Sequence, residues 1–304
     1  MLKTIGKTAK ALPGLLANSL KELLRNDPLR MAGATAFFTT FALPPILVIL
    51  IQVFKLLIGG RRIRVELFQS LSSIVGPEAV RQMVEVLRSM RKLAQNWYIN
   101  IAGFIFLLFV ASTLFKVIKS SINQVWKVRR YKHQGIVRGL GARVQSILVI
   151  LVAGLLFMVG ILAEGIQAFI GNYIFEISPV LSFYFNTALS WIISVVVVTL
   201  WFSILFRFLP DGRPDWSIAL TGGLVTAILF TIGKFVLHLL LSYSNINTLY
   251  GTSASIVLLL LFVFYSSLIL YFGAAFTKTW AYYKGRPIRP LRNAMHYQVT
   301  EADE

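Results

Sequence analysis

The sequence predicts an all-α integral membrane protein with six transmembrane helices and additional amphipathic helices at the membrane interface. Of its 304 residues, 57% are hydrophobic and only 14% are charged, whereas a soluble domain carries roughly a quarter of its residues as charges. The hydrophobic residues also form blocks, several of which exceed the roughly 18 apolar residues needed to span a hydrocarbon core. The formal net charge is +18, and the basic residues mostly flank these blocks. That placement is typical of membrane orientation and of contact with anionic headgroups, and it argues against nucleic-acid binding.

The first 31 residues are predicted to form a cytoplasmic amphipathic segment. Leucines recur near helical spacing up to Asn26, and the lysines and arginines among them are available to lipid phosphates. Pro13 is expected to divide this helix, and Asp27 with Pro28 to end it. Two interpretations stay open: a helix that lies on the membrane surface, and a helix that packs on the cytoplasmic face of the bundle.

Six apolar blocks between residues 32 and 280 form the predicted transmembrane domain. In the first block, Pro44 and Pro45 each remove a backbone donor, so we expect a helix break that faces protein or a cavity. In the fifth block, Gly222 and Gly223 are expected to permit close helix packing. The predicted spans cover about 32–58, 97–118, 146–170, 180–206, 217–241 and 253–279, and a cytoplasmic tail follows at 281–304.

The distribution of lysine and arginine predicts that both termini are cytoplasmic. One side would carry six basic residues in the amino-terminal segment, seven in 119–145, two in 207–216 and five in 278–304. The opposite side would carry seven in 59–96 and none in the two short loops. Basic residues concentrate on the cytoplasmic side of membrane proteins, so the first group of segments is expected there.

Charged residues inside the spans are the strongest candidates for a functional site, because each costs roughly 2.5–3.5 kcal/mol to insert near mid-membrane. Glu164 and Lys234 are expected at similar depth in the outer half of spans 3 and 5, where they could pair. His238 lies one turn after Lys234 on the same helix face, and Gln167 and Asn186 gather toward the same side. The pattern fits an outward-facing polar cavity for an anionic group. A structural ion pair, or a lysine reaching toward the headgroups, fits it as well.

Enzyme signatures are absent from the sequence, and we expect neither a cofactor nor a bound metal. There is no cysteine, so thiolate metal sites and cysteine nucleophiles are excluded. No phosphate-binding glycine loop or nucleophile motif occurs. The only three histidines, His133, His238 and His296, are far apart in the sequence and have no cluster of carboxylates around them.

Six segments of the chain, taken in order, form a recognisable pattern: Ala34–Leu50, Asn123–Arg130, Phe206–Arg213, Gly233–Lys234, Tyr250–Gly251 and Phe272–Lys278. In these segments the chain resembles the YihY/BrkB family of bacterial inner-membrane proteins, once labelled ribonuclease BN. The resemblance implies six spans, a bacterial inner membrane and a connection with envelope lipid handling. Many members carry Glu after the Gly-Ala of span 6, where this chain has Ala275, so any role of that carboxylate does not carry over.

These observations favour a non-enzymatic transporter or lipid-handling protein with an outward-facing polar cavity for an amphiphilic or anionic substrate. The alternative is a scaffold or envelope-assembly factor that moves no substrate, and a membrane-bound ribonuclease is the weaker third hypothesis. The expected partners are membrane lipids, whose anionic headgroups would contact the basic faces, and further copies of the chain. No nucleic acid is expected to bind.

Overall fold

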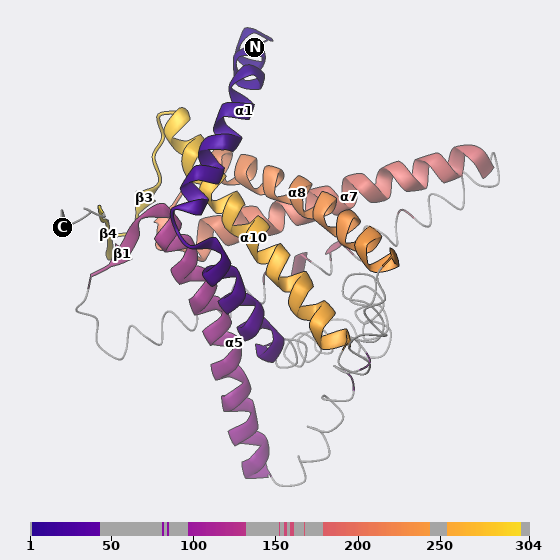
Figure 1. Cartoon of the computed structure of the whole chain (residues 1–304), viewed down its shortest axis with the longest axis vertical. Helices are drawn as coiled ribbons and strands as arrows, with labels where there is room; N and C mark the ends of the chain where they lie inside the picture. Colours follow the sequence, from indigo (N-terminus) through magenta and orange to yellow (C-terminus); the bar gives the residue numbers. More distant parts are fainter. Residues whose placement is uncertain are drawn as a thin grey trace. The chain divides into compact units, whose positions relative to one another are not determined.

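The computed structural model describes residues 2–42, 97–131, 179–243 and 254–298, together with single positions between 81 and 167. Long helices dominate the described part, and two short antiparallel sheets accompany them (Figure 1). An additional helix covers 28–42. The labelled helices are α1 (Leu2–Leu24), α5 (Trp97–Trp126), α7 (Pro179–Phe208), α8 (Trp216–Tyr243) and α10 (Ala254–Tyr283). The strands are β1 (Val128–Arg130), β2 (Gly212–Arg213), β3 (Arg289–Pro290) and β4 (Ala294–His296).

Three of the described helices are long and apolar enough to cross a membrane. They cover Tyr184–Phe208, Trp216–Leu237 and Val257–Tyr283, with mean hydropathies of 2.4, 1.8 and 2.3. These helices correspond to the predicted spans 4, 5 and 6, and they establish the helical membrane class. Predicted spans 1 and 3 lie wholly or partly outside the described residues, so the full count of six stays a prediction.

Helix α1 differs from the sequence prediction at Pro13, which does not divide it. Pro13 is exposed, so the loss of one backbone hydrogen bond falls on the outer face and the helix continues through it. The helix ends before Asp27, as predicted, and Asp27 has a positive φ of 52°. Leu15 and Leu23 are buried, whereas Leu12, Leu20 and Leu24 are exposed. One set of leucines on α1 is thus packed against the protein and another is exposed, and both open interpretations of this segment stay predictions.

The polar segments after α5 and α10 contain ordered structure that the sequence analysis treated as loops. Helix α5 continues eight residues beyond the predicted span 2, to Trp126. Strand β1 then pairs with β4 of the tail, with Arg129 opposite Met295. Strand β2, between α7 and α8, pairs with β3, so that Arg213 lies opposite Arg289. Strands of two or three residues give too short an alternation pattern to be recognised in a sequence.

The described helices group into two compact units. The first contains Met1–Asn26, Ile122–Thr231 and Leu270–Glu304, and the second contains Asp27–Ser121 and Ile232–Ile269. In the second unit, α8 and α10 approach closely at Gly233, where an added Cβ would lie 2.9 Å from side-chain atoms of Tyr265 and Ile269. The first unit contains the strands and the polar contacts described below.

Within the first unit, α8 and α10 are joined by a reciprocal pair of glycine–threonine contacts. A Cβ on Gly222 of α8 would overlap Oγ1 of Thr277 on α10, and a Cβ on Gly273 of α10 would overlap Oγ1 of Thr226 on α8. Each threonine hydroxyl donates to a glycine of its own helix, Thr226 to the Gly222 carbonyl and Thr277 to the Gly273 carbonyl, both at 2.7 Å. The hydroxyls are thus satisfied inside the apolar contact, and small residues let the backbones approach. The close packing predicted for Gly222 is confirmed.

Gly273→Ala should destabilise the protein, because the new methyl group must displace Thr226 from a fully buried contact. We expect a loss of about 1–3 kcal/mol in the free energy of unfolding, the usual cost of overpacking, measured by denaturation in mild detergent. Gly14→Ala is the control, since nothing lies within 4 Å of a Cβ there. The second substitution Thr226→Ala should recover part of the loss, and an equal effect of Gly14→Ala and Gly273→Ala would contradict the assignment.

Candidate functional site

Polar and charged side chains from four segments of the first unit gather around the end of α5, and we call this group the polar hub. The segments are the end of α1, the end of α5 with β1, the α7–α8 turn and the second half of α10. The tail that carries β3 and β4 joins them through the backbone N–H of Leu291. Asn26 and Asp211 are buried, and the other hub side chains are half-buried. The hub consists of Glu22, Asn26, Asn123, Gln124, Lys127, Arg130, Asp211 and Lys278.

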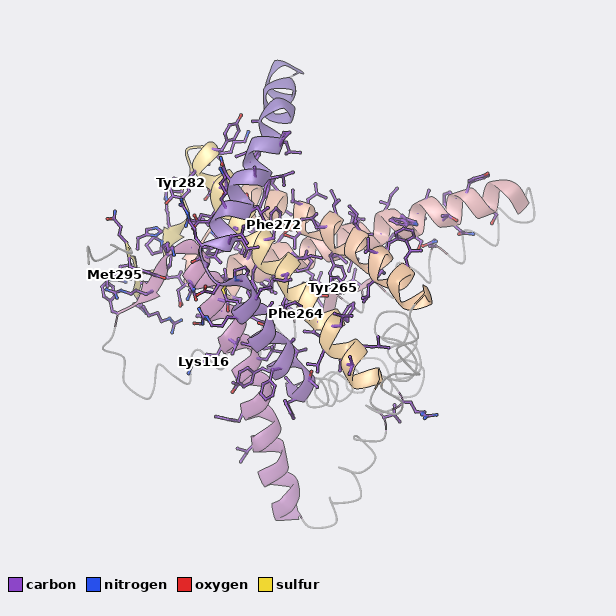
Figure 2. The ribbon with its side chains drawn as sticks, in the orientation of Figure 1. Lys116, Phe264, Tyr265, Phe272, Tyr282 and Met295 are labelled. Carbon is purple, nitrogen blue, oxygen red and sulfur yellow. The ribbon has the colours of Figure 1, made fainter. Side chains whose placement is uncertain are left out.

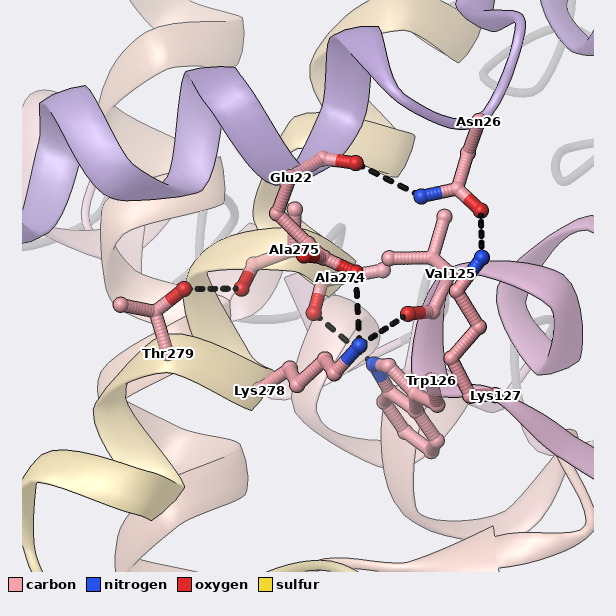
Figure 3. Close-up of polar contacts among 9 residues, drawn as sticks. All are labelled: Glu22, Asn26, Val125, Trp126, Lys127, Ala274, Ala275, Lys278 and Thr279. Atoms are coloured by element: carbon pink, nitrogen blue, oxygen red, sulfur yellow. Dashed lines mark hydrogen bonds and ion pairs between the residues drawn. The ribbon is translucent and has the colours of Figure 1, made fainter. Parts of the chain in front are cut away.

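Lys278 and Asn26 connect α1 to α5 and α10 (Figure 3). The Nζ of Lys278 lies 2.6 Å from Oε1 of Glu22 and donates to the carbonyl of Val125 at 2.9 Å. Asn26 is 1% exposed; its Oδ1 accepts from Nζ of Lys127 at 2.8 Å. Its Nδ2 donates to the Glu22 carbonyl at 2.6 Å. A buried amide with both ends satisfied specifies how the helix ends fit together.

Asp211 is the most buried charge of the hub, with its side chain 3% exposed. Its Oδ1 accepts from Nε of Arg130 at 2.7 Å, and its Oδ2 accepts from Nδ2 of Asn123 at 2.7 Å. Its backbone N–H donates to Oδ1 of Asn123 at 2.8 Å, and its carbonyl accepts from the N–H of Leu291 at 2.8 Å. One residue of the α7–α8 turn is thus bonded to α5, β1 and the tail. A buried carboxylate needs partners of this kind, because its desolvation cost is high.

Trp126, at the end of α5, forms a buried apolar contact next to the hub residues of the same segment. Trp126 is 1% exposed, and its indole N–H donates to the Ala274 carbonyl of α10 at 2.8 Å. A Cβ added to Gly212 would lie 2.8 Å from Ile288 and 3.0 Å from the Trp126 ring. Only glycine therefore lets β2 lie flat on the indole. Asp211 directly precedes β2, so its place in the hub depends on this close approach.

Burial lowers the pKa of Lys127 below the ordinary 10.5 of a lysine. The nearby carboxylate of Glu22 raises it, and the positive charges of Lys278 and Arg25 lower it further. Removing the ammonium from water disfavours its charged form. In the tail, burial raises the pKa of Tyr297 above 10.0, and the neighbouring Arg129, whose Cζ lies 5.7 Å from the ring centroid, opposes that rise.

Cations lie over aromatic rings at the adjoining helix ends, and we call this group the basic–aromatic rim: Arg207, Trp216, Trp280, Tyr283 and Lys284. The Cζ of Arg207 lies 4.7 Å from the Trp216 ring centroid, and its guanidinium also donates to the Pro214 carbonyl. The Nζ of Lys284 lies 4.7 Å from the Trp280 centroid and 5.7 Å from that of Tyr283. Trp216 and Tyr283 are each 46% exposed. Amphipathic rings and cations of this kind are typical of the membrane–water interface.

None of the site residues named from the sequence belongs to the hub, and several lie outside the described residues. Lys234 and His238 are on α8, in its portion within the second unit, and Lys234 is half-buried. Gln167, which is 9% exposed, donates from Nε2 to the Asn186 carbonyl of α7 at 2.7 Å. The contact uses the backbone carbonyl of Asn186, so a polar cavity lined by these side chains stays a prediction. Glu164, Pro44 and Pro45 lie outside the described residues, so the Glu164–Lys234 pair and the break in span 1 stay predictions.

Six of the eight hub residues lie in segments that carry the family resemblance, whereas Glu22 and Asn26 lie in the amino-terminal segment. Asn123–Arg130, Phe206–Arg213 and Phe272–Lys278 carry the resemblance stated above, and in the structure they converge on one another. Polar residues at the ends of spans are usually solvated loop residues. The sequence alone therefore did not indicate that these side chains form a site. Among the described residues, no group of three or more His, Cys, Asp or Glu side chains could hold a metal ion.

Membrane-spanning helices whose ends are tied together by a buried polar cluster define the class: an α-helical membrane protein with one polar, strongly basic end. The chain belongs to the Virulence factor BrkB family, whose model matches residues 19–297. It is similar to proteins named UPF0761 membrane protein, at 27% identity in Delftia acidovorans, covering 86% of this chain and 61% of that protein. The identity is 26% in Verminephrobacter eiseniae, with the same coverage, and 27% in Chromobacterium violaceum, covering 91% and 64%. The chain thus spans about three fifths of the length of these relatives. No solved structure matches it.

Asp211→Asn should lower the free energy of unfolding by about 2–3 kcal/mol. Removing one partner of a buried ion pair costs about 3–5 kcal/mol, and Arg130 is 32% exposed at its side chain, so water replaces part of the loss. Asp215→Asn is the matched control, because Asp215 is exposed and asparagine is an equally good residue at a helix start. Denaturation in mild detergent measures both, and equal stability of the two variants would contradict the role given to Asp211.

Lys127 should react with amine-directed reagents at lower pH than an ordinary lysine. Its pKa is lowered from 10.5, so the neutral, nucleophilic amine forms earlier as the pH rises. Competitive labelling followed by peptide mass spectrometry, repeated from pH 7 to 11, reports the midpoint for this one residue. A midpoint at or above 10.5 would show that the hub does not desolvate Lys127.

Proposed function

We propose that this protein is a lipid-handling membrane protein that binds anionic amphiphiles at the end of its spanning helices where the hub and rim lie. The observation that supports this most directly is the basic–aromatic rim at the ends of α7, α8 and α10. A lipid phosphate needs positive charge, and the first part of its acyl chains needs an apolar surface at the same depth. The rim offers both, because Arg207 lies over the exposed ring of Trp216 and Lys284 lies near the exposed ring of Tyr283, while the Trp280 ring beneath Lys284 is buried.

The charge balance of the chain supports the same proposal. The sequence carries 30 lysines and arginines against 12 acidic residues. In the hub, the buried acidic residue Asp211 is already paired with Arg130, and Glu22 is paired with Lys278. The exposed charge of the described tail is therefore mainly positive, with Arg286, Arg289 and Arg292 all exposed. Basic residues near the surface attract anionic lipids by about 1 kcal/mol each.

In this proposal the hub end faces the cytoplasm of a bacterial inner membrane, as the count of basic residues predicts. The amino-terminal segment, the segment after α5, the α7–α8 turn and the tail were all expected on one side. Hydrogen bonds between Asn26 and Lys127, Asn123 and Asp211, and Leu291 and Asp211 join these four segments. Segments that touch in this way must lie on the same side of a membrane.

The outward-facing cavity is a separate part of the proposal. Gln167 supplies one polar contact between predicted span 3 and α7, while Glu164, Lys234 and His238 contribute from the sequence pattern alone. Binding at the rim, without catalysis, is the activity that we propose first. Once lipid binding is shown, an assay can decide between two roles. The protein either moves lipid across the membrane or acts as a scaffold that only holds it.

The proposal is tested by extracting the protein with its surrounding lipid and measuring by native mass spectrometry which lipids remain bound. We expect anionic phospholipid to be enriched over the bulk membrane by about threefold or more, as a few surface cations would produce. Lys284→Gln should reduce this enrichment. Lys116→Gln should not, because Lys116 is an exposed lysine of α5 outside the rim (Figure 2). Lipid of bulk composition in the wild-type protein would reject the proposal.

A second assay separates movement from holding. The protein is reconstituted into liposomes that contain phosphatidylglycerol with a fluorescent label, and a membrane-impermeant reductant bleaches the outer leaflet. Bleaching well beyond the outer half would identify a lipid transporter. Bleaching that stops at half, in a sample that still enriches anionic lipid, would identify the scaffold.

A further inference from the structure

Two exposed arginines, Arg213 and Arg289, lie near the rim residues in the chain. Their positive charges are close enough to repel one another. Strands β2 and β3 are antiparallel, and their register places Arg213 directly opposite Arg289. Side chains of directly opposed residues point to the same face and begin roughly 5 Å apart, and like charges in that position are destabilising. Both side chains are exposed. Within the part of the chain that the structure describes, neither forms an ion pair, although Asp215 lies two residues from Arg213.

The backbone on each side of Arg213 is held firmly. Asp211 is bonded to Asn123, Arg130 and Leu291. On the other side, the Pro214 carbonyl accepts a hydrogen bond from Arg207. The strand between them cannot rotate Arg213 away, because Gly212 lies against Trp126 and Ile288. The alternation of a strand then turns Arg213 outward.

The backbone before Arg289 is also fixed. Helix α10 ends in a turn in which Gly285 has φ +64°, Gly285 N–H donates to the Tyr282 carbonyl, and Arg286 N–H donates to the Ala281 carbonyl. That pair of bonds is the Schellman motif, which needs a left-handed residue such as glycine. Ile288 is 3% exposed, and its carbonyl contacts Nε2 of His296 at 3.0 Å. Tyr282, 59% exposed, lies at this end of α10 (Figure 2).

We propose that Arg213 and Arg289 together bind the phosphate of an anionic phospholipid headgroup. Two guanidinium groups held on one face can donate several charge-assisted hydrogen bonds to one phosphate, and its negative charge offsets their repulsion. The position suits a lipid: Arg213 lies five residues after the end of one candidate span and three before the start of the next, and Arg289 lies six after the end of the third. This inference rests on the proposed function and assigns its headgroup site.

The test measures binding of short-chain phosphatidylglycerol and short-chain phosphatidylcholine to the purified full chain in detergent. Arg213→Gln and Arg289→Gln should each weaken phosphatidylglycerol binding about five- to tenfold, as expected for the loss of a charge-assisted contact. If both arginines hold one phosphate, the double variant should bind only about twofold more weakly than either single variant, because effects on shared contacts are not additive. Arg129→Gln is the matched control: it removes one exposed charge from β1, opposite Met295, and should change binding by less than about twofold.

The outcomes separate the headgroup site from the proposed function. Preference for phosphatidylglycerol in the wild type with an equal, small effect of all three single substitutions would overturn the arginine site and leave the proposed function standing. If the fold-losses in affinity of the two single variants multiplied in the double variant, the arginine site would also be overturned, because the arginines would then act independently. Lack of any preference in the wild type would reject the proposed function. If inorganic phosphate then bound in an arginine-dependent way, the ligand would be a soluble phosphate and the lipid assignment would be wrong.

A stability measurement excludes a purely structural role for the pair. Removing one of two opposed like charges relieves repulsion, so without lipid each single variant should unfold at the same temperature as the wild type or slightly higher. Phosphatidylglycerol should raise the unfolding temperature of the wild type more than that of either variant. A lower unfolding temperature of the lipid-free variants, with unchanged lipid stabilisation, would show that the arginines serve the fold alone.

Discussion

The buried carboxylate of Asp211 is the constraint on which the polar end of this protein depends. It is 3% exposed at its side chain, and its backbone and side-chain groups together contact α5, β1 and the tail. A charge at that depth is tolerated only when its partners are in place. The α7–α8 turn therefore cannot form without the end of α5, β1 and the tail. Arg213 and Trp216 owe their positions to the same contacts, because both lie within five residues after Asp211 in the chain.

Close helix packing supports the polar end from within the membrane region. The reciprocal contacts of Gly222 with Thr277 and of Gly273 with Thr226 set the approach of α8 and α10. Because hydrophobic driving force between helices is weak in lipid, such contacts specify geometry through van der Waals packing. They also fix the separation of the two helix ends that carry Trp216 and Trp280. The cations of the rim thus lie over rings whose spacing is set by residues deep in the bundle.

Hydrophobic block length was enough to predict α7, α8 and α10 within a few residues, because the thickness of a membrane imposes those lengths. Charges inside spans, such as Lys234, were predicted to be functional because a charge is costly to insert into a membrane. Asp211 was not predicted, because its burial arises from contacts made 81 and 88 residues away in sequence. A polar residue in a turn between spans has no local feature that distinguishes burial from solvation. The strands β1 to β4 were missed for a related reason, since each depends on a partner segment far along the chain.

The most direct test of this account is a double-mutant cycle between Asp211→Asn and Arg130→Gln, with the free energy of unfolding measured in mixed micelles. If Asp211 ties β1 to the α7–α8 turn, the two substitutions should not add, and a coupling energy of about 1–2 kcal/mol should remain. The chain contains no cysteine, so disulfide formation does not complicate the comparison. Additive effects, with a coupling energy below about 0.3 kcal/mol, would contradict the central role of the buried carboxylate.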